Sequence, residues 1–170
     1  MDAYIKGELM LMADSLVAPT NRDFCRSNAN IDFAMLENSW IPHKEFNNYM
    51  SALRQKVGQI GPRLVGKQIA KTLDGMTGAL TKAEYIVKAF TMISDMYREN
   101  NKGADVDEYR IETLQNGFIR VVTRSPLDEG FHIGVGEGFI RFYNKLLTRA
   151  DLTENMAIHG RTVFEYEWKA

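Results

Sequence analysis

Residues 117–168, GFIRVVTRSPLDEGFHIGVGEGFIRFYNKLLTRADLTENMAIHGRTVFEYEW, carry the pattern that decides the fold of this chain. Asn116-Gly117 at their start is a strong hairpin signal, because both central residues of the tightest hairpin turn need a positive φ. Apolar and charged side chains alternate in residues 109–113 before the turn, and an apolar segment, residues 118–123, follows it. The sequence therefore predicts a pair of antiparallel strands around this turn.

Downstream of this hairpin, the pattern changes to that of a helix and then back to strands. Apolar residues at helical spacing predict a helix over residues 135–147. Residues Thr153–Ile158 and Thr162–Trp168 predict a second hairpin that turns at His159-Gly160. The glycines at 134, 136 and 138 lack the spacing of a dinucleotide-binding loop. We interpret them as residues that let this helix sit close to the sheet.

The first hundred residues instead follow the 3.6-residue period of helices. Thr81 and Glu84 form a capping box that predicts the start of the last helix in this part. The polar stretch from Thr20 to Asn30 predicts a loop. The predicted helices cover residues 5–18, 31–38, 42–57, 64–73 and 82–100.

Together these patterns predict an α+β fold, in which an N-terminal helical layer packs on a small antiparallel C-terminal sheet with one crossing helix. At 170 residues, the chain suits a single domain. Its helical part would be residues 1–103 and its sheet-containing part residues 104–170. Hydrophobic residues make up 45% of the sequence, which is sufficient for a core without disulfides or metal.

Charge and cysteine content argue against several classes of function. The net charge of −1 gives no reason to expect binding to nucleic acid or to a membrane surface. Cys25 is the only cysteine, which rules out an internal disulfide and a CxxC zinc site. No apolar run approaches the ~20 residues of a membrane span, and the acidic start is unlike a signal peptide. We expect a cytoplasmic protein.

No pattern typical of a catalytic or metal site stands out. His43, His132 and His159 are too far apart in sequence for a helical metal pair. Residues 61–67 match the GxxxxGK of a phosphate-binding loop, but a helical period precedes them and Gln68 replaces the required hydroxyl. We interpret these glycines as helix-packing residues, and we predict neither a catalytic residue nor a metal.

Several segments resemble the closing block of vinyl-4-reductase-like domains. They are VVTRSP (121–126), GVGEGFI (134–140) and ENMAIHGRTVFEYEW (154–168); upstream, ALRQKVGQIGPRLVGKQI (52–69) resembles a helix of the same families. These families share a fold group with haem NO-binding (H-NOX) sensors and TRAPP-type subunits. The resemblance implies a ligand-sensing or regulatory domain, often dimeric, that works with signalling modules.

The resemblance also bears on cofactors. Vinyl-4-reductase-like domains often carry zinc-binding cysteines in the closing block, where this sequence has Glu154 and His159 but no cysteine. H-NOX sensors hold haem with a histidine on the helix before the sheet and with a Tyr-x-Ser-x-Arg motif. Residues 82–100 contain no histidine, and Thr123-Arg124-Ser125 does not match that motif. We therefore expect no cofactor, with haem or another tetrapyrrole left open, though not through the H-NOX histidine.

Methionines and aromatic residues of the helical layer would make a good wall for an apolar pocket. We expect a non-enzymatic sensor or regulatory domain that binds a small apolar or aromatic molecule between helices and sheet. We also expect a signalling partner and a homodimer. The predicted ligand-binding residues are Trp40, Phe46, Met50, Phe90, Ile93, Tyr97, Arg124 and His132.

Two alternatives stay open at this point. One is a protein-interaction or dimerisation module of the TRAPP-like type without a ligand, in which the helices form the dimer face and the core is filled. The other is a small enzyme that uses Cys25 or His132, which requires both residues in one cleft.

Overall fold

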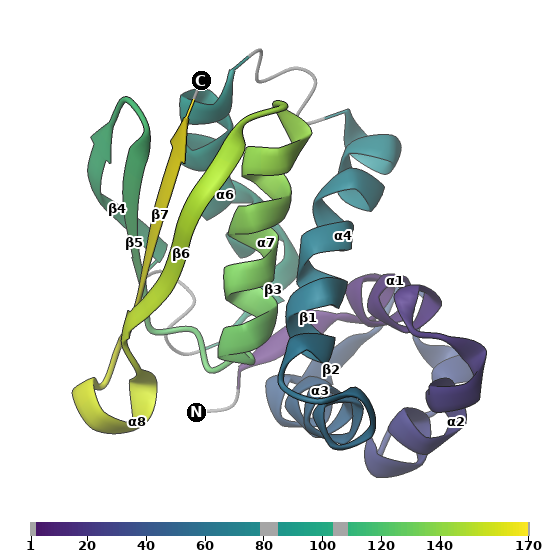
Figure 1. Ribbon diagram of the computed structural model, residues 1–170. Helices are drawn as coiled ribbons and strands as arrows, with labels where there is room; N and C mark the ends of the chain where they lie inside the picture. The colour runs from purple at the N-terminus through teal and green to yellow at the C-terminus, as the bar shows by residue number, and fades with distance from the viewer. Residues whose placement is uncertain (1–2, 79–84, 104–108, 170) are drawn as a thin grey trace.

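A computed structural model describes residues 3–78, 85–103 and 109–169 (Figure 1). Its helices are α1 (Gly7–Leu16), α2 (Pro19–Asn28), α3 (His43–Val57), α4 (Ile60–Thr77), α6 (Ile86–Asn100), α7 (Glu129–Phe142) and α8 (Met156–His159), with a 3-10 turn at Phe33–Met35. Its strands are β1 (Tyr4–Lys6), β2 (Trp40–Pro42), β3 (Asn101–Lys102), β4 (Tyr109–Gln115), β5 (Phe118–Thr123), β6 (Leu146–Glu154) and β7 (Thr162–Lys169). The predicted α+β fold class is confirmed.

Strands β4 to β7 form the larger sheet, which is antiparallel throughout and has the order β4-β5-β7-β6. Gly117, with φ 84°, supplies the positive φ in the turn between β4 and β5. Side chains alternate across β5, so that Ile119 is fully buried while Arg120 pairs with Glu165 on the outer face at 3.0 Å. The predicted hairpin at Asn116-Gly117 is confirmed, but of the two turn residues only Gly117, and not Asn116, has the positive φ expected of both.

Helices α6 and α7 cover the inner face of this sheet, and α4 packs on α7. In Figure 1, α7 lies between the sheet and α4, and α1, α2 and α3 form a group beside the lower end of α4. The ring of Phe90 on α6 lies 5.7 Å from that of Phe139 on α7 and 6.0 Å from that of Tyr166 on β7. Aromatic packing between α6, α7 and the sheet therefore forms the centre of the core.

Helices α4 and α7 meet through glycines. A Cβ atom at Gly66 would collide with the carbonyl oxygen of Phe131, and one at Gly134 would collide with that of Arg63. The interpretation of these glycines as helix-packing residues is confirmed. The α7 glycines at 134, 136 and 138 were predicted to face the sheet. Only Gly136 does so, against Tyr166, whereas Gly134 and Gly138 face α4.

A second, three-stranded sheet corrects the prediction that the first hundred residues are all helix. Strand β1 pairs with β2 on one side and with β3 on the other. Tyr4 lies opposite Lys102, so the pairing joins distant parts of the chain. Strands of two or three residues carry no readable alternation, and sequence periodicity cannot reveal them.

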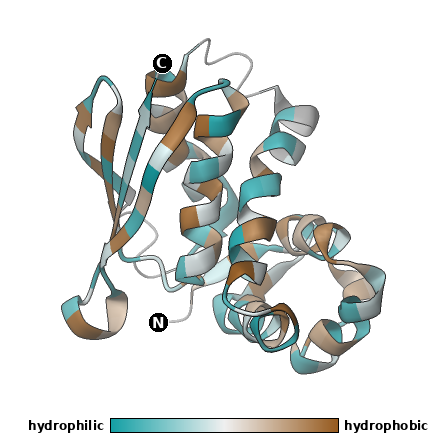
Figure 2. Cartoon of the chain, in the orientation of Figure 1, coloured by the Kyte–Doolittle hydropathy of each residue, from teal (hydrophilic) through white to brown (hydrophobic). Residues whose placement is uncertain are grey.

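The predicted loop at residues 20–30 is wrong, since most of it belongs to helix α2. Pro19 occupies the first turn of that helix, where a missing N–H costs nothing. The carboxylate of Asp14 on α1 then accepts hydrogen bonds from Arg26 Nε at 3.0 Å and Nη2 at 2.6 Å. Figure 2 shows how hydrophilic α2 is. The polar residues that suggested a loop are the outer face of a surface helix.

Helix α7 begins well before the predicted start at Val135. Asp128 is its N-cap and accepts a hydrogen bond from the Phe131 N–H at 3.0 Å. The first half of α7 was not predicted as helix because its glycines lower helix propensity. The second predicted hairpin is partly wrong, because the short helix α8 lies between β6 and β7 and because Leu147 belongs to β6.

Other predicted bounds need smaller corrections. The helix predicted over residues 31–38 is reduced to a 3-10 turn, and α4 continues past residue 73 to Thr77. Helix α6 ends at Asn100 as predicted, whereas the capping box at Thr81 and Glu84 lies outside the described residues. None of the helices described here is long and apolar enough to cross a membrane.

Candidate functional site

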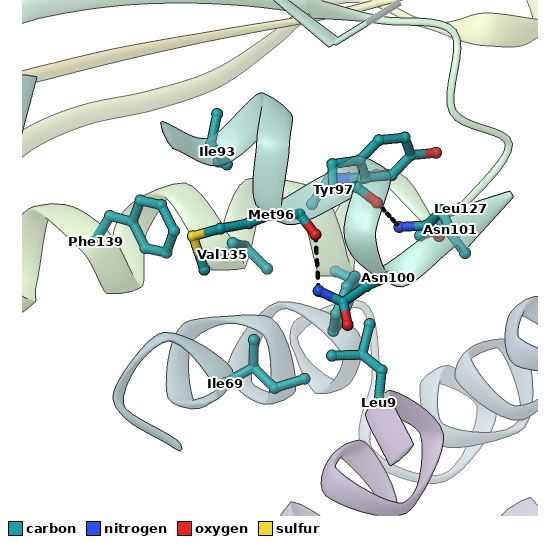
Figure 3. A pocket seen from close by; sticks show the side chains of 12 residues that line it. Leu9, Ile69, Ile93, Met96, Tyr97, Asn100, Asn101, Leu127, Val135 and Phe139 are labelled. Carbon is teal, nitrogen blue, oxygen red and sulfur yellow. Dashed lines mark hydrogen bonds between the residues drawn. The ribbon is translucent and has the colours of Figure 1, made fainter. Parts of the chain in front are cut away.

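A cavity of about 70 Å³ lies where α1, α4, α6 and α7 meet. Figure 3 shows Leu9 from α1, Ile69 from α4 and Val135 from α7 converging on it with side chains of α6. The volume corresponds to about two water molecules at their ~30 Å³ share of the liquid. The lining residues are Leu9, Ile69, Ile93, Met96, Tyr97, Asn100, Asn101, Leu127, Phe131, His132, Val135 and Phe139.

Polar groups gather at the end of α6, on one side of this cavity. Asn100 Nδ2 donates to the Met96 carbonyl at 2.7 Å, and Asn101 Nδ2 donates to the Tyr97 carbonyl at 2.8 Å (Figure 3). Both amides thus cap the last turn of α6. Asn101 Oδ1 also accepts from His43 Nε2 at 2.9 Å. These bonds hold the helix end in place beside the cavity.

His132 is a buried titratable group of the cavity wall. Its Nε2 lies 3.0 Å from Ser125 Oγ, and the Leu127 N–H donates to the same hydroxyl at 3.3 Å. Burial, with a smaller contribution from the charge of His43, lowers the pKa of His132 to about 3. The imidazole is therefore neutral at pH 7 and adds no charge to the cavity.

The pair of Ser125 and His132 does not make an activated nucleophile. An imidazole with a pKa near 3 is a weak general base at neutral pH. Ser125 is only 1% exposed. The pair is better explained as a connection between the end of β5 and the first turns of α7.

Cys25 does not join His132 in the cavity. It is fully buried on α2, and burial together with the carboxylate of Asp14 raises the pKa of its thiol. A thiol held protonated is a poor nucleophile and a poor metal ligand. Across residues 3–78, 85–103 and 109–169, no three His, Cys, Asp or Glu side chains are arranged to hold a metal ion.

The structure brings three of the eight predicted ligand-binding residues together. Ile93, Tyr97 and His132 all line the cavity. Phe46 stands one layer behind it, with its ring 5.0 Å from that of Phe131, and Phe90 stands behind Phe139 in the same way. The ligand-binding role of these residues remains a prediction.

The other three predicted residues lie elsewhere. Met50 is fully buried on α3. Trp40 lies on β2, where Lys102 Nζ sits 4.4 Å from the centroid of its ring. Arg124 is exposed at the end of β5.

Leu9, Ile69, Val135 and Phe139 line the cavity but were not among the predicted ligand-binding residues. A signal existed for Leu9 and Phe139, since both lie on the apolar stripe of a predicted helix. Nothing in the sequence shows that these stripes meet around a void, because that depends on how four helices cross.

The fold is that of solved H-NOX structures. An H-NOX protein from S. oneidensis in the Fe(II)NO ligation state superposes with a TM-score of 0.74 at 13% identity, over 98% of this chain and 100% of that one. A Cs H-NOX mutant with 4-cyano-L-phenylalanine at site 5 gives 0.73 at 13% identity, over 98% and 97%. A structure described as modulating haem redox potential through protein-induced porphyrin distortion gives 0.70 at 14% identity, over 98% and 100%.

These likenesses confirm the H-NOX part of the resemblance at the level of the fold. The vinyl-4-reductase-like and TRAPP-type parts remain predictions. No protein-family model and no curated protein matches the sequence significantly.

The expectation of no cofactor is wrong for this fold. One structure that shares it comes from work on haem distortion in the H-NOX family, and another is in the Fe(II)NO ligation state. Haem is therefore the cofactor that the fold implies. The residues present do not fit haem in the packing described. The cavity of about 70 Å³ is far below the ~300 Å³ at which ordinary ligand pockets begin. Nε2 of His132, the histidine of the cavity wall, is already bonded to Ser125.

Proposed function

We propose that this chain is a sensor domain that binds a small, mainly apolar molecule in the cavity between α1, α4, α6 and α7. The observation that carries the proposal is the cavity itself, lined mainly by aliphatic and aromatic side chains. Protein interiors are close-packed and contain few voids larger than a water molecule. A filled core would have favoured the interaction-module alternative.

The lining predicts the kind of ligand. Leu9, Ile69 and Val135 offer dispersion contacts, and filling a void between such side chains recovers contacts that the empty cavity lacks. His132 is neutral because its pKa lies near 3, so a charged ligand would enter without a counter-charge. Small uncharged molecules are therefore favoured.

The position of the cavity suggests how binding could be sensed. Leu9 and Ile69 come from α1 and α4, whereas Val135 comes from α7, next to the sheet. A ligand that fits one spacing of these helices better than another shifts the population towards that spacing. Haem would supply a metal centre for small molecules if bound, but the cavity of about 70 Å³ is too small for it in this packing.

Leu127 marks a route by which small molecules could enter. It lines both the cavity and an outer cleft of about 550 Å³ that also contains Asn47, Arg54 and Asp128. Arg54 Nη2 and Asp128 Oδ2 are 2.5 Å apart across this cleft. Leu127 is therefore a lining residue that the cavity and the outer cleft share.

Xenon under pressure is a suitable first probe, because dry apolar cavities take it up. We expect saturable shifts of the methyl signals of Ile69, Ile93 and Val135 in NMR spectra. Val135→Leu should abolish these shifts by filling the cavity. Val87→Leu on α6, a half-buried position outside the cavity lining, should leave them unchanged. Xenon shifts spread over the surface would contradict the proposal.

Absorption spectra during a titration with haem test the other occupant. A Soret band that saturates at one haem per chain and weakens in Val135→Leu would contradict the proposed ligand class. It would show that the ligand is haem, bound in a cavity that opens to accept it. A protein that gives no such band while xenon binds at the same methyl groups supports the ligand class proposed here.

A further inference from the structure

We propose that a groove on the outer side of the α4–α7 helix pair docks an acidic amphipathic helix of a partner protein. This outer groove has a volume of about 550 Å³. It is lined by Leu64, Lys67, Gln68, Lys71, Gly138, Arg141 and Phe142. Docking itself does not depend on the proposed function, whereas the coupling to the cavity argued below rests on it.

Exposed apolar side chains lead along α4 into the outer groove. Ile60 is 56% exposed and Leu64 is 47% exposed, one helical turn further on. Val57, at the end of α3, is 40% exposed and extends the row. Phe142 adds a half-buried ring from α7. A contiguous apolar row rimmed by polar residues is typical of a surface that contacts another molecule.

The charge of the outer groove is of one sign. Lys67, Lys71 and Arg141 line it, and no lining residue is acidic. Lys67 shares the buried carboxylate of Glu137 with Arg63, at 3.7 Å and 2.5 Å. In the part of the chain that the structure describes, neither Lys71 nor Arg141 forms an ion pair.

The outer face of the larger sheet offers a contrast. There Arg120, Arg149 and Arg161 each pair with one or more carboxylates. Lys71 and Arg141 thus leave positive charge on the groove that no carboxylate of the described residues neutralises. Charge complementarity therefore selects an acidic partner.

The shape of the groove suits a helix. It runs between two helices that cross in backbone contact at Gly138 and Lys67, and such a furrow accepts the side-chain ridge of a third helix. The groove lining runs from Leu64 to Lys71 on α4. Together with Ile60 of the apolar row, the docking surface extends about 16 Å along α4, at ~1.5 Å per residue. About three turns of a partner helix would cover it, with leucines on the apolar row and glutamates against Lys71 and Arg141.

The same two helices carry the cavity on their other side. On α4, Ile69 lines the cavity and Gln68 lines the outer groove; on α7, Phe139 lines the cavity and Gly138 the groove. A ligand that changes the spacing of α4 and α7 must therefore change the width of the groove. If the proposed function holds, the partner reads cavity occupancy here.

A fluorescent synthetic peptide of about 18 residues, long enough for partial helix formation, with leucines at helical spacing and glutamates elsewhere, tests the docking by anisotropy. We expect saturable one-to-one binding that weakens at least tenfold in the double variant K71E/R141E. The control is K44E/K88E, which reverses two exposed cations on α3 and α6, and it should bind within twofold of the original chain. Circular dichroism verifies that both variants fold, and amide shifts should map to residues 60–71 and 138–142.

Three results would overturn the docking: no saturable binding, equal weakening in both double variants, or association with phosphatidylserine vesicles in place of the peptide. Repeating the titration under xenon tests the coupling. Equal peptide affinity with and without bound xenon overturns the coupling alone. Absence of xenon binding with normal peptide binding overturns the proposed function and leaves the docking surface in place.

Discussion

His132 Nε2 lies 3.0 Å from Ser125 Oγ in the core, so that a histidine on α7 is tied to the end of β5. The imidazole is 5% exposed and touches the rings of Tyr97 and Phe164, whose centroids lie 6.2 Å and 5.8 Å away. A proton added to this ring would be surrounded by apolar groups and by Ser125. The folded state therefore holds the ring neutral.

This burial makes stability depend on pH. The pKa of His132 falls from 6.5 to about 3 on folding, so between these values the unfolded chain binds the extra proton. The free energy of unfolding is therefore highest well above pH 6.5, where both states hold the ring neutral. It falls as the pH falls below 6.5, by up to about 1.4 kcal/mol per pH unit. We expect urea unfolding to show about 2 kcal/mol less stability at pH 5 than at pH 7.

His132→Gln should flatten this pH dependence even though it lowers stability at pH 7. His43, whose pKa burial also lowers, acts in the same direction and leaves part of the slope. His159→Gln, at an exposed position, is the control and should keep the full slope. An unchanged slope in His132→Gln would show that other groups cause it.

Gly134→Ala should destabilise the chain by about 1–3 kcal/mol, the usual cost of overpacking. The added Cβ would meet the backbone carbonyl of Arg63 on α4, which cannot rotate away. Gly130→Ala is the matched change on the same helix, where the new Cβ meets no backbone atom and comes closest to a side-chain oxygen, Asp128 Oδ1 at 3.0 Å, with Pro62 and Arg54 at ordinary contact distances. That variant should change the unfolding free energy by less than about 1 kcal/mol. Similar losses in both would contradict the proposed steric cause.

Asp14→Asn should cost about 2–3 kcal/mol, because it weakens hydrogen bonds to a charged, buried acceptor. Asp14 is 3% exposed and accepts from Arg26 and from Tyr49 Oη, the latter at 2.9 Å. Asp23→Asn on the exposed side of α2 should stay within about 0.5 kcal/mol of the original chain. Chemical denaturation measures the free energy of unfolding of both variants. Equal losses in the two would show that the carboxylate of Asp14 does not stabilise the packing of α2.

Local signals explain what the sequence could predict of the fold. Asn116-Gly117 demands a positive φ whatever surrounds it, and Gly117 has one. The N-cap Asp128 was an equally local signal for α7, but the glycines after it weakened the helical pattern. Helix α2 could not be recognised from its own residues, because its main anchor is Asp14 on another helix.

The site was less predictable than the fold, for a geometric reason. Ile93, Tyr97 and His132 were chosen as residues of an apolar wall, and they do share one cavity. Phe46 and Phe90 have the same character and lie one ring further out. Whether an apolar residue lines the cavity or packs in the core behind it depends on a difference in position of only one layer of side chains. Hydrophobic periodicity gives the buried face of a helix but not those distances.

Leu9→Ala should turn the small cavity into one that accepts a benzene ring. Leu9 is 9% exposed and lines the cavity from α1, so truncation removes its methyl groups from the wall at a cost of about 2–5 kcal/mol. The cavity then approaches the ~150 Å³ of engineered apolar cavities that bind benzene. Benzene should raise the melting temperature of this variant and restore part of the lost stability.

Leu53→Ala on α3, at a 3% exposed position outside the cavity lining, should lose comparable stability but show a smaller benzene response. Equal rescue of the two variants would mean that benzene fills whatever void truncation leaves, and the cavity between α1, α4, α6 and α7 would have no special capacity for ligands.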